Sequence, residues 1–315
     1  MLKRAGFHAI ACLSNLLPRA VQYRIAHAVG DCCYLFDHNA RENVKANIRC
    51  ILGPDASEKL VRREARWVFR SFGMYLCEFF GHRHFGGDFV DRHVVVQGRE
   101  NLDAALARGR GAIFCSGHYS NWEMGGTVVG HLGYPIVIVA QMHADAKTNE
   151  MFVKQRADFG ITVVPTQHGA KGALKALRNN QPVALLGDRP TGGPVVPVTL
   201  CGRTTYLPQG PWRIALVTGA PLLPTFVHRR SNENFTLEIG APIEVPETGT
   251  QRERMLIMAQ RWADVFEARL RVDPSQWAAF YRVWDDPKTG ALGVSQSLAM
   301  PPKKLTAGLR EAGDA

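Results

Sequence analysis

The sequence lacks the glycine-rich motifs and cysteine pairs that mark several common classes of protein. It has no Gly-x-Gly-x-x-Gly dinucleotide fingerprint, no P-loop and no Gly-x-Ser-x-Gly nucleophile elbow. These absences argue against a dehydrogenase, a P-loop kinase and a serine hydrolase. The 7 cysteines are scattered and include no Cys-x-x-Cys pair, so neither a zinc ribbon nor a thioredoxin-like site is predicted. A reducing, cytosolic setting is the simplest interpretation.

Acidic side chains are scarce relative to basic ones. The 315 residues include 38 Lys and Arg against 28 Asp and Glu, which gives a net charge of +10. This excess predicts anionic partners such as nucleic acid, an anionic membrane surface or the phosphates of a donor such as coenzyme A. No basic run with interleaved aromatic residues and no zinc-finger spacing is present, so we expect no nucleic-acid partner.

Long hydrophobic runs are also missing, and the mean hydropathy of −0.13 argues against a protein with several membrane spans. Residues 1–18 form the first apolar stretch, which is short for a transmembrane helix. We interpret it as an amphipathic helix on a membrane surface, with a plain packing helix as the alternative. Residues 1–70 contain 12 Lys or Arg and 6 Asp or Glu, which favours contact of this end with anionic lipid.

The segment around His118 contains the candidate catalytic residues. The apolar run from Ala112 to Cys115 is typical of a buried strand, and Ser120 and Asn121 are good first residues for a helix. His118 therefore lies on the turn between a strand and a helix, where ligands bind in open α/β sheets. From the helix start, Glu123 could approach the imidazole and orient it as a general base. Alternatively, Ser120-x-x-Glu123 is a capping box with no catalytic role.

Apolar strands alternate with helical segments through the middle of the chain. Such alternation predicts an α/β fold with a mainly parallel, mixed sheet flanked by helices. Two later strands, at 221–228 and 235–245, are predicted to form a hairpin that extends the sheet. The strands predicted before them cover residues 93–97, 112–115, 134–140, 161–165, 182–186 and 195–200.

Three regions are predicted along the chain. Residues 1–80 form an N-terminal helical, membrane-associating segment, with helix expected throughout 17–53. In that helix Arg41, Lys45 and Arg49 share one side, either as a phospholipid-facing stripe or as a solvated face. Residues 81–286 form the α/β domain. Residues 287–315 are rich in Gly, Pro, Ser and Lys and are expected to be a disordered tail.

Two further segments are candidates for the site. Asp188 and Arg189 follow the strand at 182–186, and so would lie at the same edge of the sheet as His118. Arg189 could bind a phosphate bidentately, although a salt bridge between loops is an equal alternative. Gly210 and Pro211 open a helix whose free amide groups favour an anion or a developing oxyanion.

The spacing His118-x4-Glu123 resembles the signature of the bacterial lipid A biosynthesis acyltransferases, within the glycerophospholipid acyltransferase superfamily. It is also similar to the mycobacterial phosphatidylinositol mannoside acyltransferases, where the acid is Asp. Arg41 and Asn47, and the aromatic ending 274–285, match the family in order. Ser120 stands where the family often has glycine, and residues 187–190 differ from the usual lipid A form, which leaves the acceptor open.

The resemblance implies a membrane-surface O-acyltransferase that moves a fatty acyl chain from a thioester to a hydroxyl of a lipid or glycolipid. His118 would deprotonate this hydroxyl, and Glu123 would support His118. The co-substrate would be acyl-CoA or acyl carrier protein, with no metal and no other cofactor. The expected location is the cytoplasmic face of the cell inner membrane, peripheral or through an N-terminal helix. The substrate-binding candidates are Asn121, Arg156, Asp188, Arg189 and Gly210.

Two other classes of function remain open at this stage. A non-catalytic lipid-binding or membrane scaffold protein could use the same groove without turnover, and it would release no free thiol from acyl-CoA. A basic nucleic-acid-binding protein would bind DNA in a salt-sensitive manner and would not bind liposomes.

Overall fold

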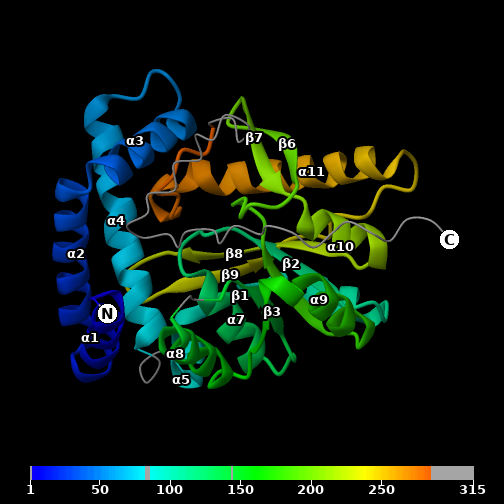
Figure 1. The fold of residues 1–315 in the computed structure, drawn as a ribbon, viewed down its shortest axis with the longest axis horizontal. Coiled ribbons are helices and arrows are strands. Elements are labelled where there is room, and N and C mark those ends of the chain that lie inside the picture. The colour runs from blue at the N-terminus through cyan, green and yellow to red at the C-terminus, as the bar shows by residue number, and fades with distance from the viewer. Residues whose placement is uncertain (1, 82–85, 143–144, 285–315) are drawn as a thin grey trace.

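The computed structural model describes residues 2–81, 86–142 and 145–284, so the tail expected at 287–315 lies outside the described residues (Figure 1). The strands are β1 Val94–Gln97, β2 Ala112–Ser116, β3 Val137–Ala140, β4 Thr162–Pro165, β5 Pro182–Leu186, β6 Val195–Leu200, β7 Arg203–Pro208, β8 Leu222–Arg229 and β9 Phe235–Ile239. The helices are α1 Leu2–Leu16, α2 Arg19–Phe36, α3 His38–Leu52, α4 Glu58–Phe80, α5 Gly87–His93, α6 Arg99–Ala107, α7 Trp122–His131, α8 Ala146–Ala157, α9 Gly169–Arg178, α10 Gly210–Thr218 and α11 Gln251–Val272, with the short 3-10 turns η2 Thr166–His168 and η3 Pro274–Gln276.

Seven strands form one mixed sheet in the order β1-β9-β8-β2-β5-β3-β4. Neighbouring strands are parallel except β8 and β9, which form an antiparallel hairpin. The predicted α/β class and the predicted hairpin are therefore confirmed. The strands β6 and β7 form a separate antiparallel pair, and β7 was not predicted from the sequence.

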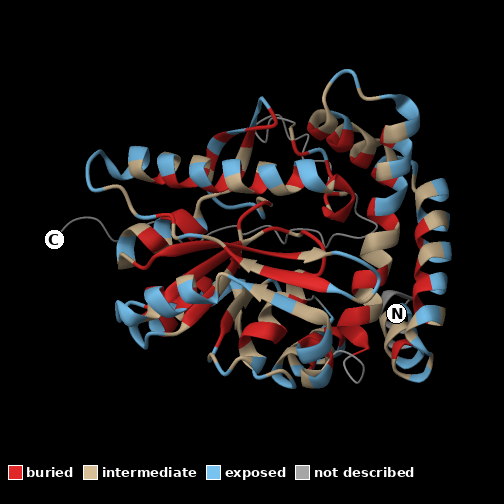
Figure 2. Cartoon of the chain, turned by 180° about the vertical axis from the view of Figure 1, so that it is seen from behind, coloured by how far each residue is buried: buried red, intermediate tan, exposed pale blue. Residues whose placement is uncertain are grey.

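Helices cover both faces of the sheet. Because successive side chains of a strand point to opposite faces, β2 supplies two different cores. Ile113 and Cys115 pack in a cluster with α9, α10 and α11, whereas Ala112 and Phe114 pack in a cluster with α5, α6 and α7. The central strands are therefore buried on both sides, which fits their continuous apolar sequence (Figure 2).

The N-terminal helices are tied to the α/β part of the molecule by buried polar contacts. Glu78 of α4, whose side chain is fully buried, accepts hydrogen bonds from Tyr23 of α2 at 2.8 Å and Arg229 of β8 at 2.7 Å. Asn47 of α3 donates to the backbone oxygens of Ala279 and Tyr281 at 3.0 and 2.7 Å. Losing one partner would leave a buried polar group unsatisfied, so these contacts fix the helices in place.

The helix expected throughout residues 17–53 is broken at Asp37. The Asp37 side chain accepts a hydrogen bond from the Ala40 backbone N–H at 2.9 Å and so begins α3. Arg41 donates to the last carbonyl groups of α2, at Tyr34 and Leu35, over 3.0 and 2.8 Å. These two side chains satisfy the two helix ends that the break exposes.

The basic row that begins with Arg41 is engaged within the protein. Lys45 lies 3.1 Å from Glu58, and Arg49 also pairs with Glu58. The three side chains therefore interact with protein groups, which does not favour a stripe reserved for phospholipid.

Candidate active site

His118 is held by a carboxylate from the loop after the neighbouring strand. β2 and β5 are parallel, and Ser116 lies opposite Leu186. His118 and Asp188 each follow these positions by two residues, so their side chains meet at the carboxyl edge of the sheet. Nδ1 of His118 lies 2.9 Å from Oδ1 of Asp188. Because an ionised carboxylate only accepts hydrogen bonds, Nδ1 carries the hydrogen and Nε2 is left as an acceptor.

Asp188 is fixed by two other donors. Its Oδ2 accepts from the His118 backbone N–H at 3.0 Å and from the indole N–H of Trp277 at 2.9 Å. Burial by itself would raise the pKa of Asp188, whose side chain is only 2% exposed. The His118 ring and the hydrogen bonds from His118 and Trp277 outweigh burial and lower that pKa below its ordinary value. The carboxylate therefore stays ionised and holds the imidazole in one orientation.

The turn between β2 and α7 depends on close packing. A Cβ atom at Gly117 would lie 2.9 Å from the Phe266 ring and 3.3 Å from Cγ of Asp188. Only glycine therefore lets the two loops approach. Ser120 has a φ of 53°, in the left-handed region that favours glycine. Ser120 therefore holds a strained backbone conformation, which glycine would adopt without strain.

The C-terminal segment holds the same turn. The Ser120 amide donates to the Gln276 carbonyl at 2.7 Å, and the Ala278 amide donates to the His118 carbonyl at 2.8 Å. Trp277, between these two residues, contacts Asp188. The aromatic ending of the chain was predicted to cap the core, and it also positions the candidate catalytic residues.

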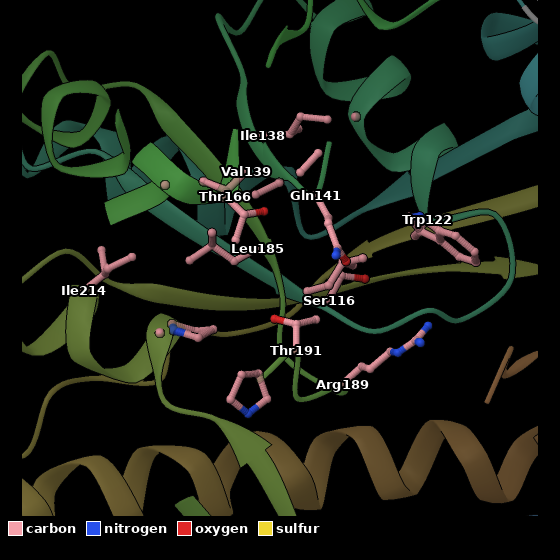
Figure 3. Close-up of a pocket in the computed structure, with 18 of the residues that line it drawn as sticks. Ser116, Trp122, Ile138, Val139, Gln141, Thr166, Leu185, Arg189, Thr191 and Ile214 are labelled. Atoms are coloured by element: carbon pink, nitrogen blue, oxygen red, sulfur yellow. The ribbon is translucent and has the colours of Figure 1, made fainter. Parts of the chain in front are cut away.

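A cavity of about 580 Å³ opens beside His118 (Figure 3). In the figure Trp122 and Arg189 lie toward one end of the space and Ile214 toward the other. Most of its lining is apolar and comes from β3, β5, α9 and α10, which leaves a slot suited to a hydrocarbon chain. The apolar residues of this slot are Ile138, Val139, Ala140, Ala170, Leu174, Ala184, Leu185, Leu186, Ile214 and Val217.

Glu123 pairs with Arg156 rather than with His118. The guanidinium donates to both carboxylate oxygens, at 2.6 and 3.1 Å, and it lies 5.7 Å from the Phe79 ring centroid. The side chains of the ion pair are 12% and 13% exposed, and both residues line the cavity. The predicted contact between Glu123 and His118 is thus corrected, because Asp188 occupies that position.

Because this ion pair is largely buried, removing one partner should destabilise the fold. We expect Glu123→Ala to lower the free energy of unfolding by about 3 kcal/mol, since it strands a buried guanidinium. The double variant Glu123→Ala/Arg156→Met should recover most of that loss. Urea denaturation of both variants measures the effect, with the exposed residue Glu150 changed to alanine as the control. A Glu123→Ala protein of unchanged stability would contradict this structural role.

The other predicted site residues have different roles. Asn121 is 2% exposed, and its Oδ1 accepts from the Met124 amide at 2.9 Å, so it begins α7. Its amide donates to Glu78 at 2.7 Å, which leaves little access for a substrate. Ser120 is therefore not the first residue of a capping box. Asp188 is too buried to bind substrate directly and instead orients His118.

Arg189 and Gly210 lie where substrate could reach them. Both line the cavity, and the Arg189 guanidinium packs over the Tyr281 ring with 5.2 Å to the centroid. A Cβ at Gly210, the first residue of α10, would meet open space. Among the residues that the structure describes, no group of three His, Cys, Asp or Glu side chains is arranged to hold a metal ion.

Comparison with known proteins gives one consistent result. Residues 5–286 match the family described as bacterial lipid A biosynthesis acyltransferase. The chain is 29% identical over 266 residues to the phosphatidylinositol mannoside acyltransferase of Mycobacterium tuberculosis (strain CDC 1551 / Oshkosh), covering 80% of this chain and 79% of that protein. It is 25% identical over 258 residues to the protein of the same name from Mycolicibacterium smegmatis, covering 80% and 82%. The resemblance found in the sequence is thereby confirmed.

Proposed function

Because the chain belongs to the bacterial lipid A biosynthesis acyltransferase family, we propose that it transfers a fatty acyl chain from a thioester to a hydroxyl of a lipid or glycolipid. Membership makes it an acyltransferase of lipid biosynthesis. The finer proposal rests on one observation: His118 lines an apolar cavity while its Nδ1 is held by a buried carboxylate. The ring is therefore oriented to act as a base at Nε2.

In the proposed reaction Nε2 of His118 takes the proton of the acceptor hydroxyl. The oxygen then attacks the thioester carbonyl, and a tetrahedral oxyanion forms. The imidazolium is stabilised by Asp188, which stays ionised. When the carbon–sulfur bond breaks, the thiolate leaves and receives the proton from Nε2. The base is restored, and the products are an ester and a free thiol.

The oxyanion is proposed to lie near the start of α10. The first amide groups of a helix have no partner within the helix, and the helix dipole favours negative charge there. Gly210 brings this helix start to the cavity wall, and Pro211 follows at the first turn. Arg189, at the same cavity, supplies a second positive charge for the donor or the acceptor.

We place the acyl chain in the apolar slot and the protein at a membrane surface. No helix among the described residues is long and apolar enough to cross a membrane. However, α2 carries an exposed apolar row, with Ile25, Val29 and Phe36 exposed by 38%, 54% and 85%. A helix face of this kind favours peripheral binding, which we assign to the cytoplasmic face of the inner membrane.

The acceptor is proposed to be a glycolipid, because the relatives reported above are named for acylation of phosphatidylinositol mannoside. Purified protein incubated with an acyl thioester and extracted membrane lipids should release free thiol and yield a heavier lipid by mass spectrometry. A scaffold or lipid-binding protein would give neither product. Absence of thiol release with every donor and lipid fraction would refute the proposed reaction.

A further inference from the structure

Helix α4 holds the start of α7 at two positions. Tyr75 and Glu78 are three residues apart on α4 and so lie on one side of it. Oε2 of Glu78 accepts a hydrogen bond from the Asn121 amide at 2.7 Å, and the Tyr75 ring stacks on Trp122 with 4.1 Å between ring centroids. Asn121 caps α7, and Trp122 is the first residue of that helix. The two contacts therefore fix where α7 begins.

The position of Trp122 matters because its ring packs against His118. The two ring centroids lie 5.0 Å apart, with 69° between the ring planes. The hydrogen bond from Nδ1 to Asp188 still allows the imidazole to tilt about that contact. Trp122 blocks this tilt on one side, and it lines the same cavity as His118 (Figure 3). The direction in which Nε2 points thus depends on Trp122 as well as on Asp188.

The acceptor for Asn121 is itself held in place. The Glu78 side chain is fully buried, and it also accepts hydrogen bonds from Tyr23 at 2.8 Å and from Arg229 at 2.7 Å. These two donors belong to α2 and β8, so the carboxylate is fixed from both sides of α4 (Figure 1). Because a carboxylate accepts stronger hydrogen bonds than a neutral group, Glu78 is a strong and rigid partner for the Asn121 amide.

We propose that Glu78 is a positioning residue for the reaction at His118; the proposal rests on the acyl transfer proposed above. Glu78 holds Asn121, Asn121 sets the start of α7, and Trp122 then lies where it restrains the imidazole. Tyr75 supports the same tryptophan ring from α4. This gives the N-terminal helices a part in turnover in addition to their contacts with the rest of the fold.

The test removes the contact between Glu78 and Asn121 without removing the helix cap. In Asn121→Ser the hydroxyl can still begin α7, but no amide reaches Glu78. We expect kcat for thiol release to fall about 10- to 100-fold, the cost of a slightly misplaced reacting group. KM for the acyl donor should change little, because most of the apolar slot is built on β3, β5, α9 and α10.

The matched control is Tyr23→Phe. It removes one hydrogen bond to the same carboxylate, from α2, and leaves the Asn121 contact intact. Both variants should lower the midpoint of urea denaturation, since each leaves a buried carboxylate with one donor fewer. Only Asn121→Ser should lower kcat, measured under conditions in which both proteins are folded. A contact that serves stability alone would leave kcat the same in both variants.

A reciprocal variant restores the contact with donor and acceptor exchanged. In Glu78→Gln/Asn121→Asp the new amide can donate to the new carboxylate, which also keeps one negative charge beside Arg229. Aspartate is as good a helix cap as asparagine. This variant should turn over substrate several times faster than Asn121→Ser, because its two changes compensate each other.

Three results would overturn the proposal: normal kcat in folded Asn121→Ser, an equal loss of kcat in Tyr23→Phe, or a folded reciprocal variant that is no faster than Asn121→Ser. If the natural protein turns over no donor, the proposed reaction fails, and the restraint is then measured on the ring itself. The imidazole NMR signals of His118, assigned by their loss in His118→Asn, must broaden or shift in Asn121→Ser and stay unchanged in Tyr23→Phe for the proposal to stand.

Discussion

Replacing His118 with asparagine should lower the rate of acyl transfer by about 100- to 10,000-fold, the usual cost of losing a general base. Asparagine suits this test because its amide N–H can replace the Nδ1 hydrogen bond to Asp188 while the basic Nε2 disappears. His118→Ala should reduce the rate equally, but it also leaves the buried Asp188 carboxylate without one of its donors. The measurement is thiol release at saturating donor, together with the unfolding midpoint of each variant.

The control for this prediction is His131→Asn. His131 ends α7 and pairs with Asp91 at 2.8 Å, outside the cavity lining. We expect this variant to retain near-normal transfer. Normal turnover by a folded His118→Asn protein would show that another group takes the hydroxyl proton.

The sequence predicts the local features of the fold better than the pairing of its strands. The apolar run before His118 and the helix that begins at Asn121 follow from residues close in sequence, and both are present. The break at Asp37 was missed because Asp37 and Arg41, whose side chains satisfy the two exposed helix ends, are also compatible with a continuous helix. The order of the seven strands depends on contacts distant in sequence, which periodicity does not report.

The same limit explains the error in the candidate site. Glu123 was chosen as the partner of His118 because it is five residues away, whereas Asp188 is 70 residues away and meets His118 only when β2 and β5 pair. A signal was present, since both residues follow predicted strands that would end at one edge of the sheet. What the sequence did not contain was the register, which places Ser116 opposite Leu186. Trp277, which donates a hydrogen bond to Asp188, lies 89 residues further along the chain.

The second large effect is expected from Asp188→Asn, which should lower the rate by about 1,000- to 10,000-fold, as for a carboxylate that holds a catalytic histidine. Oδ2 accepts from both the His118 amide and the Trp277 indole, so this position must stay an oxygen. The new NH2 group would then face Nδ1 of His118. Two donors cannot share that contact, so the imidazole must move its hydrogen to Nε2, where it can no longer accept the proton.

The pH dependence of the free energy of unfolding should also report the ionisation of Asp188. Its folded pKa is lowered, so its contribution is present above the ordinary value of 3.8 and is lost as the pH falls through the folded value. Urea denaturation gives the free energy of unfolding of the natural protein and of Asp188→Asn at each pH. The part of the difference between them that comes from the charge of the carboxylate should persist down to about pH 4 and shrink below it. Asp158→Asn, at an ion pair on the surface with Lys154, is the matched control and should change both rate and stability little. A folded Asp188→Asn enzyme with normal turnover would mean that the ring does not depend on this carboxylate for its orientation.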